Sequence, residues 1–262
     1  MTSAAAEPLG STAREHRHGD AIWITTPDFE ARGRAAGLPD AAVIERWLAV
    51  HDGNGASPGT GRAPTRVEGL PGSSERVHVR RALHGGWLAP LWRGRIAGLG
   101  RLREELRVTA RLHAAGAPVP APAFALARRD GLLWRAALCT RHVEQAVDAI
   151  AFLRAGPTRA AATAAARAAG RAVRCVHDLG LRHADLHLGN LLVRGDETSG
   201  FRAWVIDLDR ARLGAPLPVA SRRRQLARLR RSLDKRGLRD ALGRDGRDGF
   251  CEGYAADRPD GD

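Results

Sequence analysis

The chain has 262 residues, which is enough for one sizeable hydrophobic core or for two small lobes. Its 44% hydrophobic and 27% charged residues are ordinary for a globular protein and exclude a fibrous or wholly disordered chain. The net charge of +13 comes almost entirely from arginine, because Lys235 is the only lysine. Such a charge favours acidic partners: phosphates, nucleic acid or anionic lipid.

The cysteines and the apolar segments bear on the cellular compartment. Cys139, Cys175 and Cys251 lack the spacing of metal ligands, and an odd, scattered set argues against a disulfide framework. Residues 1–20 contain no apolar segment of the kind found in signal peptides. No stretch approaches the roughly 18 apolar residues of a membrane span. We therefore expect a cytoplasmic protein that meets a membrane only from its cytoplasmic surface.

The first eighty residues predict a flexible arm followed by short elements. The arm covers residues 1–20, and an apolar strand at 21–24 is followed by a predicted turn at Thr26-Pro27-Asp28 and by a helix at 40–51. Residues 52–74 are rich in Gly, Pro and Ser, but their spacing does not match G-x-G-x-x-G. A loop with incidental glycines is the favoured interpretation of that segment.

Alternating and helical patterns follow. Val77 and Val79 alternate as in a half-buried strand, so Arg80 is expected on the opposite face. A helix is predicted at 99–115, in which Glu104 and Glu105 would by default face solvent. Beyond it, Asp130-Gly131 predicts a β-hairpin. The remaining predicted elements are helices at 144–154 and 158–179, strands at 191–193 and 203–206, a basic amphipathic helix at 221–236 and a flexible tail at 237–262.

Two short acidic motifs carry the predicted chemistry. Asp185 and Asn190 lie five residues apart in a loop before a strand, the order in which kinases place a hydroxyl-orienting Asp and a metal-binding Asn. Asp207 adds a carboxylate at the end of the next strand, and His187 could donate a hydrogen bond to the transferring phosphate. Phosphoryl transfer needs an aimed hydroxyl and cations on the phosphate oxygens. The motifs together predict phosphoryl transfer with ATP and Mg²⁺.

Competing interpretations of these motifs remain open. Each motif alone is more often a turn or a surface cluster than a site. His183, Asp185 and His187 form an H-x-D-x-H pattern that also resembles some metal-binding clusters, although the Leu-Gly-Asn that follows fits a kinase better. For Asp209, an ion pair with Arg210 or Arg212 is as good an explanation as a direct role.

The chain resembles the bacterial lipopolysaccharide-core kinases of protein-kinase-like fold, and the Kdo kinase family most closely, where Kdo is 3-deoxy-D-manno-octulosonic acid. The resemblance covers roughly residues 75–236. It is carried by the segments at 79–86, 103–107, 110–112, 116–122, 183–190, 206–210 and 225–233. It implies an α+β, two-lobed protein-kinase-like fold. The implied N-lobe, at 21–140, is β-rich with one main helix, and the implied C-lobe, at 141–236, is mostly helical.

The resemblance also implies roles for individual residues. Asp185 becomes the catalytic base, and Asn190 and Asp207 become the metal ligands. Glu105 becomes the helix-C glutamate, and Arg80 takes the place of the usual phosphate-binding lysine. Gln225 stands where an Asn is expected.

The function implied by the resemblance is that of an ATP-dependent kinase that phosphorylates Kdo on a lipid A precursor in lipopolysaccharide core biosynthesis. This acceptor is an acidic glycolipid at the cytoplasmic face of the inner membrane. We therefore expect peripheral membrane binding through the basic helix. Nucleic acid is not an expected partner. Two alternatives remain: a phosphotransferase for a small molecule of the aminoglycoside or choline kind, and a noncatalytic module that binds anionic surfaces.

Overall fold

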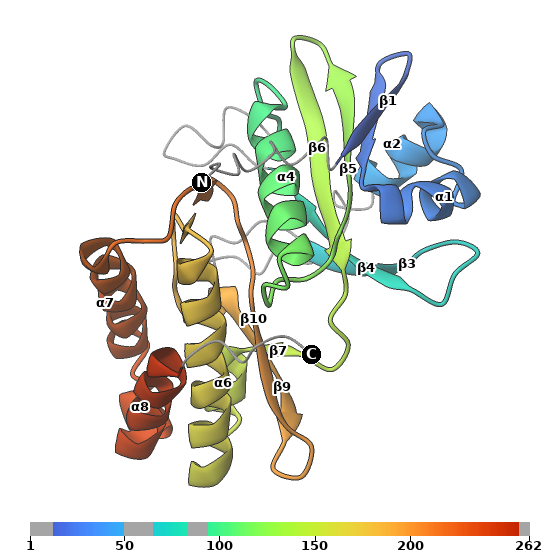
Figure 1. The fold of residues 1–262 in the computed structure, drawn as a ribbon. Helices are drawn as coiled ribbons and strands as arrows, with labels where there is room; N and C mark the ends of the chain where they lie inside the picture. The colour runs from blue at the N-terminus through green and yellow to red at the C-terminus, as the bar shows by residue number, and fades with distance from the viewer. Residues whose placement is uncertain (1–12, 50–64, 83–93, 257–262) are drawn as a thin grey trace, which may run out of the picture. The chain divides into compact units, whose positions relative to one another are not determined.

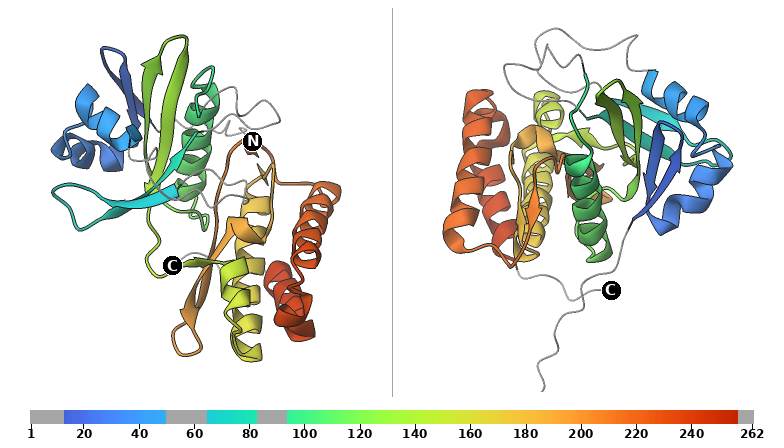
Figure 2. Two further views of the ribbon diagram at one scale, coloured as in Figure 1. Left: turned by 180° about the vertical axis from the view of Figure 1, so that it is seen from behind. Right: turned by 90° about the horizontal axis from the view of Figure 1, so that it is seen from above.

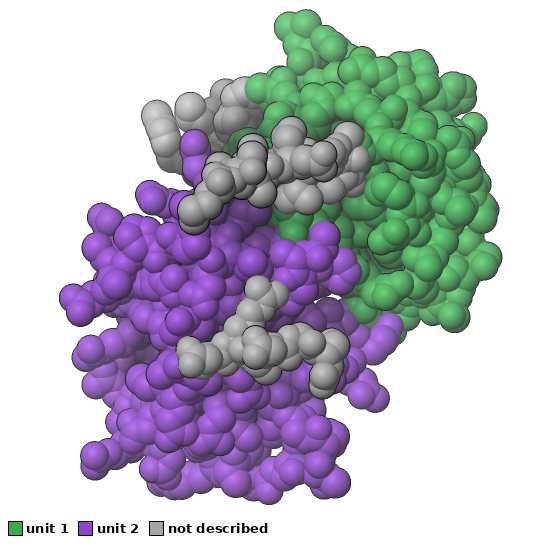
Figure 3. All heavy atoms as spheres, in the orientation of Figure 1, with its two compact units in different colours: residues 1–111, 121–142 green, residues 112–120, 143–262 purple. Residues whose placement is uncertain are grey.

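The computed structural model describes residues 13–49, 65–82 and 94–256 and divides into two units, which Figure 3 colours separately. Unit 1 comprises residues 1–111 and 121–142, and unit 2 comprises residues 112–120 and 143–262. Strands dominate unit 1, and helices dominate unit 2 (Figure 1). The glycine-rich stretch at 53–61 lies outside the described residues.

Unit 1 is built on an antiparallel sheet. Its described strands are β1 (Arg14–His18), β2 (Ala21–Thr25), β3 (Thr65–Gly69), β4 (Arg76–Arg81), β5 (Pro122–Asp130) and β6 (Leu133–Arg141). Their order across the sheet is β1-β2-β5-β6-β4-β3. β5 and β6 pair from Pro122 opposite Thr140 to Asp130 opposite Leu133, which is the predicted hairpin. Arg80 and Val79 point to opposite faces of β4, as successive strand residues do.

Helices cover both faces of this sheet. They are α1 (Pro27–Ala35), α2 (Ala41–Ala49) and α4 (Gly100–Ala114). Trp23 of β2 is buried in one cluster with Ile44 of α2, and its neighbour Ile24 is buried in a second cluster with Leu106 of α4. The sheet therefore carries a separate core on each face. The predicted turn at residues 26–28 is the start of α1 instead, because Pro27 occupies a first-turn position where its missing N–H costs nothing.

The prediction of a flexible arm through residue 20 is wrong for residues 14–18, which form the edge strand β1. Arg14 pairs with Thr25 of β2, and the ladder continues to His18 opposite Ala21. Arg14 also forms an ion pair with Glu30 of α1 at 2.6 Å, and Glu15 forms one with Arg103 of α4 at 2.9 Å. An edge strand of this kind needs no apolar side chains, so the polar sequence gave no strand pattern.

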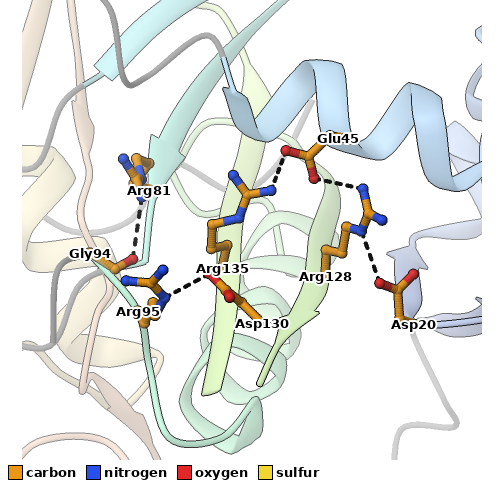
Figure 4. A network of polar contacts seen from close by, with 8 residues as sticks. All are labelled: Asp20, Glu45, Arg81, Gly94, Arg95, Arg128, Asp130 and Arg135. Carbon is orange, nitrogen blue, oxygen red and sulfur yellow. Dashed lines mark hydrogen bonds and ion pairs between the residues drawn. The ribbon is translucent and has the colours of Figure 1, made fainter. Parts of the chain in front are cut away.

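A chain of ion pairs ties α2 to the sheet (Figure 4). Glu45 of α2 accepts hydrogen bonds from Arg128 of β5, at 2.9 Å, and from Arg135 of β6. Arg128 also donates to Asp20 at 3.0 Å, in the turn between β1 and β2. Close by, Arg95 donates to Asp130 at 2.7 Å. One network of charges thus connects elements that are more than a hundred residues apart in sequence.

Unit 2 surrounds the long helix α6 (Figures 1 and 2). Its elements are β7 (Val147–Asp148), α5 (Ala149–Arg154), α6 (Arg159–Asp178), β8 (Leu181–Arg182), the 3-10 turn η1 (Leu188–Asn190), β9 (Leu191–Asp196), β10 (Gly200–Val205), β11 (Arg212–Leu213), α7 (Val219–Lys235) and α8 (Arg239–Ala255). A small antiparallel sheet has the order β10-β9-β7, and β11 pairs with β8. The helix predicted at 144–154 is shorter, because β7 takes its first part and Asp148 caps α5 by accepting from the amides of Ile150 and Ala151, each at 3.0 Å.

α6 is the central helix of unit 2. Thr158 caps its N-terminus by accepting from the amide of Ala161 at 3.0 Å. Alanine and valine on several of its faces are buried, as the sequence predicted. None of the helices in the described ranges, α6 included, combines the length and the apolar character that crossing a membrane requires.

The prediction of a flexible tail at 237–262 is wrong for residues 239–255, which form α8. α8 and α6 pack so closely that a Cβ atom added at Gly253 would lie 2.0 Å from the carbonyl oxygen of Arg167, and one at Gly170 would lie 2.2 Å from that of Phe250. The glycines therefore serve close helix packing, whereas their frequency in the sequence had suggested disorder. Residues 257–262 lie outside the described part of the chain.

A buried histidine joins α6 and α8. His177 has no exposed surface, and its Nδ1 lies 2.8 Å from the hydroxyl oxygen of Tyr254. The pKa of His177 is lowered to about 4. Burial of the ring is the largest cause, and the nearby positive charge of Arg222 is the next. His177 is therefore neutral at pH 7.

The pH dependence of stability should reveal this residue. Because the pKa of His177 falls from 6.5 in an unperturbed ring to about 4 in the fold, the unfolded chain binds the proton first, and stability is lost as the pH falls through that window. We expect His177→Gln to have a lower free energy of unfolding than the wild type at pH 7.5, and this difference to shrink by about 2–3 kcal/mol at pH 4.5. Urea unfolding of both proteins at the two pH values measures the difference. An equal difference at both pH values would contradict the lowered pKa of His177.

Candidate active site

The residues from His183 to Asn190 form a loop whose two ends are fixed by short elements of unit 2. α6 ends before Gly180, which has a φ of +83° and whose missing side chain lets the backbone approach the carbonyl oxygen of Gly214. β8 then leads into the loop, and η1 and β9 continue from it. The loop therefore begins at a paired strand and ends at another.

The buried side chain of His183 holds the loop through two hydrogen bonds. The side chain is 2% exposed, Nδ1 accepts from the backbone amide of Asp185 at 3.1 Å, and Nε2 lies 3.0 Å from the carbonyl oxygen of Ile206. An amide can only donate and a carbonyl can only accept, so Nε2 carries the proton. Burial lowers the pKa of His183, which keeps this neutral tautomer.

Helix α7 supports the same loop through polar contacts. Gln225, which stands where the family resemblance implies an Asn, accepts from the backbone amide of His183 through Oε1 at 3.1 Å. Arg228 donates to the carbonyl oxygen of Ala184, and the amide of Leu188 donates to the hydroxyl of Ser232 at 3.4 Å. Sequence reasoning missed the two last contacts. Residues 225, 228 and 232 share one helix face, and this polar stripe beside the apolar one was the signal that could have revealed them.

The Asp185 side chain points away from this buried support. It is 72% exposed, while the Nδ2 atom of Asn190 donates to the Asp185 carbonyl oxygen at 2.9 Å. His187 lies near, with Nε2 3.6 Å from Oδ2 of Asp185. A carboxylate on a rigid backbone and open to solvent can accept the proton of a hydroxyl group that binds there.

Asn190 directly precedes strand β9, and Asp207 follows the paired strand β10. β9 and β10 pair with Leu191 opposite Val205, and the amide of Ile206 donates to the carbonyl oxygen of Asn190 at 3.0 Å. Asp207 follows directly, is exposed, and has a φ of +59°, a left-handed conformation that is uncommon for a residue with a side chain. Because the Asn190 amide nitrogen donates to Asp185, its Oδ1 atom is the one left to act as a ligand. An amide oxygen and a carboxylate suit a hard cation such as Mg²⁺.

The hydrogen bonds of His183 argue against the competing metal site of His183, Asp185 and His187. Both ring nitrogens of His183 have protein partners, so neither has a lone pair directed at a metal ion. Within the described ranges, no cluster of three or more His, Cys, Asp or Glu side chains is arranged to hold a metal ion. Asp209 is half-buried, and the neighbouring Arg210 is exposed.

In unit 1, the structure brings Arg80 and Glu105 together. Nη2 of Arg80, on β4, donates to Oε1 of Glu105, on α4. Glu105 is buried, with 6% of its side chain exposed, whereas the neighbouring Glu104 has 44% of its side chain exposed and pairs with Arg107 at 2.6 Å. The expectation that both glutamates face solvent is therefore wrong for Glu105. A buried carboxylate requires a cation, and here that cation is an arginine.

The mixed helix and sheet fold is that of a kinase of protein-kinase-like fold, and the exposed Asp185, with Asn190 before β9 and Asp207 after β10, has the order expected of such a kinase. Comparisons with known proteins agree. A family model described as "Lipopolysaccharide kinase (Kdo/WaaP) family" matches residues 71–250. The chain belongs to this family, as the resemblance predicted.

Individual relatives give the same result. The 3-deoxy-D-manno-octulosonic acid kinase of Xylella fastidiosa is 36% identical over 243 residues, with 86% of this chain and 92% of that protein covered. The enzyme of the same name from Vibrio cholerae is 30% identical over 135 residues, and there the match covers 52% of this chain and 54% of that protein. The chain thus spans about half the length of the latter relative.

One solved structure supports the fold. WaaP in complex with acyl carrier protein has a TM-score of 0.55 and 22% sequence identity, with 86% of each chain covered. The predicted α+β kinase fold is confirmed, and so is the predicted class of enzyme, a phosphotransferase that acts on a sugar hydroxyl in lipopolysaccharide core biosynthesis. Membership in a kinase family implies ATP as the phosphoryl donor.

The ion pair in unit 1 can be tested by unfolding. Arg80→Met should lower the free energy of unfolding by about 3 kcal/mol, because it removes the guanidinium that faces the buried Glu105 carboxylate. Arg80→Lys, which keeps the positive charge, should cost less. Arg107→Met is the matched control on α4, and its exposed pair with Glu104 should contribute less than about 1 kcal/mol. Equal losses for Arg80→Met and Arg107→Met in urea unfolding would exclude a buried ion pair.

Proposed function

We propose that this protein transfers the γ-phosphoryl group of ATP to a hydroxyl of Kdo on a lipid A precursor. The observation that carries the proposal is the exposed Asp185 carboxylate on a loop fixed by buried hydrogen bonds, beside Asn190. The names of the relatives that are Kdo kinases support the choice of acceptor.

Asp185 orients the acceptor and takes its proton. The acceptor oxygen forms a bond to the γ-phosphorus, the bond from that phosphorus to the bridging oxygen of ADP breaks, and the hydroxyl proton passes to the Asp185 carboxylate. His187, 3.6 Å from that carboxylate, donates to the transferring phosphoryl group. Positioning and charge account for most of the catalysis, since the protein forms no covalent bond with the phosphate.

Asn190 and Asp207 are the proposed ligands of Mg²⁺. Their support is the pairing of β9 with β10, which fixes Asn190 against Ile206, the residue before Asp207. The ion, when bound, supplies positive charge to the phosphate oxygens. Asp207 contributes the negative charge that retains the ion, and Asn190 contributes a neutral oxygen whose direction is set by its bond to Asp185.

Arg80 is the proposed cation for the nucleotide phosphates, and Glu105 positions it. A guanidinium presents five N–H donors in one plane, so one edge can contact a carboxylate and another edge a phosphate. The hydrogen bond from Nη2 of Arg80 to Glu105 supports this arrangement within unit 1.

α7 is the proposed contact with the cytoplasmic face of the inner membrane. Arg223, Arg224, Arg230 and Arg231 are exposed along it, and in the described part of the chain none of the four forms an ion pair. Each basic residue near an anionic membrane surface contributes about 1 kcal/mol. Such a surface also disfavours a cationic acceptor such as an aminoglycoside.

The proposed reaction is tested with Mg-ATP and a Kdo-bearing lipid A precursor. Mass spectrometry should detect one added phosphate with the wild type. Asp185→Asn keeps the shape of the side chain but cannot take a proton, so its rate should fall by roughly a hundredfold or more. Asp240→Asn, an exposed change on α8, is the control and should be as active as the wild type. Equal rates for Asp185→Asn and the control would refute the role of Asp185.

The proposed metal site is tested through nucleotide affinity. Asp207→Asn removes a negative charge, so the affinity for ATP in the presence of Mg²⁺ should fall by about tenfold or more, while the affinity in EDTA should change little. Isothermal titration calorimetry measures both. If the substitution weakens binding equally in Mg²⁺ and in EDTA, Asp207 is not a metal ligand.

A further inference from the structure

A cavity of about 450 Å³ lies within unit 2 and is lined by residues of α5, α6, β9, α7 and α8. One wall is made of alanines from α6, among them Ala162, Ala166 and Ala169, which fall on one helix face. The opposite wall contains Leu226 and Leu233 of α7. Each wall extends over seven residues of helix, or about 10 Å. The cavity is therefore apolar along about two turns of α6 and about two turns of α7.

The cavity reaches the proposed catalytic loop. Leu188 and Leu191, which lie on either side of the Gly189-Asn190 pair, are part of its lining. The same short segment thus contributes Asn190 to the proposed metal site and two leucines to the cavity. A group bound in the cavity would therefore contact side chains of the same segment that carries Asn190.

Positive charge is found where the cavity meets solvent. Among the described residues that line it, the charged ones are all arginines, Arg223 and Arg230 of α7 and Arg247 of α8, and all three are exposed. The lining thus combines an apolar interior with a cationic boundary. It is complementary to a molecule that has a hydrocarbon chain and an anionic head group.

We propose that this cavity binds one acyl chain of the phosphorylated glycolipid acceptor, while the three arginines contact an anionic group of the same molecule. The identity of the acceptor rests on the proposed function, whereas the chemistry of the ligand rests on the cavity itself.

Other ligands fit the cavity less well. A peptide segment would bring backbone N–H and C=O groups that need hydrogen-bond partners, and alanine and leucine side chains offer none. A nucleotide or a free sugar phosphate would suit the arginines but not the interior. An unbranched acyl chain has no polar atoms, so it needs no hydrogen-bond partner in the apolar interior.

The first test compares two forms of the acceptor. Ala166→Leu narrows the cavity, and Leu226→Gln makes its half-exposed wall polar. Either change should raise KM for the acylated acceptor in phosphatidylcholine vesicles at least fivefold, and leave kcat and the KM for the fully deacylated acceptor within twofold. Ala160→Leu is the matched control, because Ala160 is exposed on α6 and does not line the cavity. An equal rise of KM for both forms of the acceptor would overturn the proposal.

The second test needs no catalysis. Cys251 lines the cavity and is exposed, whereas Cys139 is buried. Dodecyl phosphate should slow alkylation of Cys251 by N-ethylmaleimide at least fivefold in the wild type, and butyl phosphate should not. The protection should be lost in Ala166→Leu and kept in Ala160→Leu. Equal alkylation rates with and without dodecyl phosphate would exclude an acyl site.

The two tests separate the possible failures. If neither form of the acceptor is phosphorylated but dodecyl phosphate protects Cys251, the proposed function fails and the acyl site stands. Protection by acylated acyl carrier protein, with none by the glycolipid, would overturn the glycolipid as the source of the chain. Protection that appears only at concentrations where the protein dimerises, measured by light scattering, would assign the cavity to a second copy of the chain.

Discussion

The proposed catalytic loop depends on the hydrogen bonds of one buried histidine. His183 accepts from the amide of Asp185 and donates to the carbonyl oxygen of Ile206, so one ring fixes both the loop and the residue before Asp207. Water cannot replace either partner, because the ring is enclosed. Burial also favours the neutral ring, and only a neutral ring can accept at one nitrogen while it donates at the other. A protonated ring would turn a donor toward the amide of Asp185.

The helices after the loop extend this support. Gln225 and Arg228 satisfy backbone groups at His183 and Ala184, and α8 reaches α6 through the contact of Tyr254 with His177. α7 and α8 thus carry no proposed catalytic group. α7 supplies partners for backbone groups that the loop cannot satisfy itself, and α8 packs against α6. Unit 2 therefore has its proposed catalytic residues in the middle of the stretch 143–262 and their support in its C-terminal part.

The proposed roles of Asp185, Asn190 and Asp207 could be argued from the sequence alone, because these residues lie in short segments with a fixed order. β1 and α8 could not be predicted, because an edge strand and a helix rich in glycine are stabilised by partners distant in sequence. The resemblance suggested the pair of Arg80 and Glu105, but local sequence could not, since the two residues lie 25 positions apart and an isolated glutamate in a helix gives no sign of burial.

An arginine at position 80 has a physical consequence beyond the replacement of one cation by another. A lysine is a point charge that can turn between a carboxylate and a phosphate, whereas a guanidinium has a fixed plane. The contact of Nη2 with Glu105 therefore also sets the direction of the remaining N–H groups of Arg80. In this chain, Glu105 of α4 therefore determines the orientation of the proposed phosphate-binding group. The burial of Glu105 is the structural cost of that orientation, because a buried carboxylate is stable only while its cation stays in place.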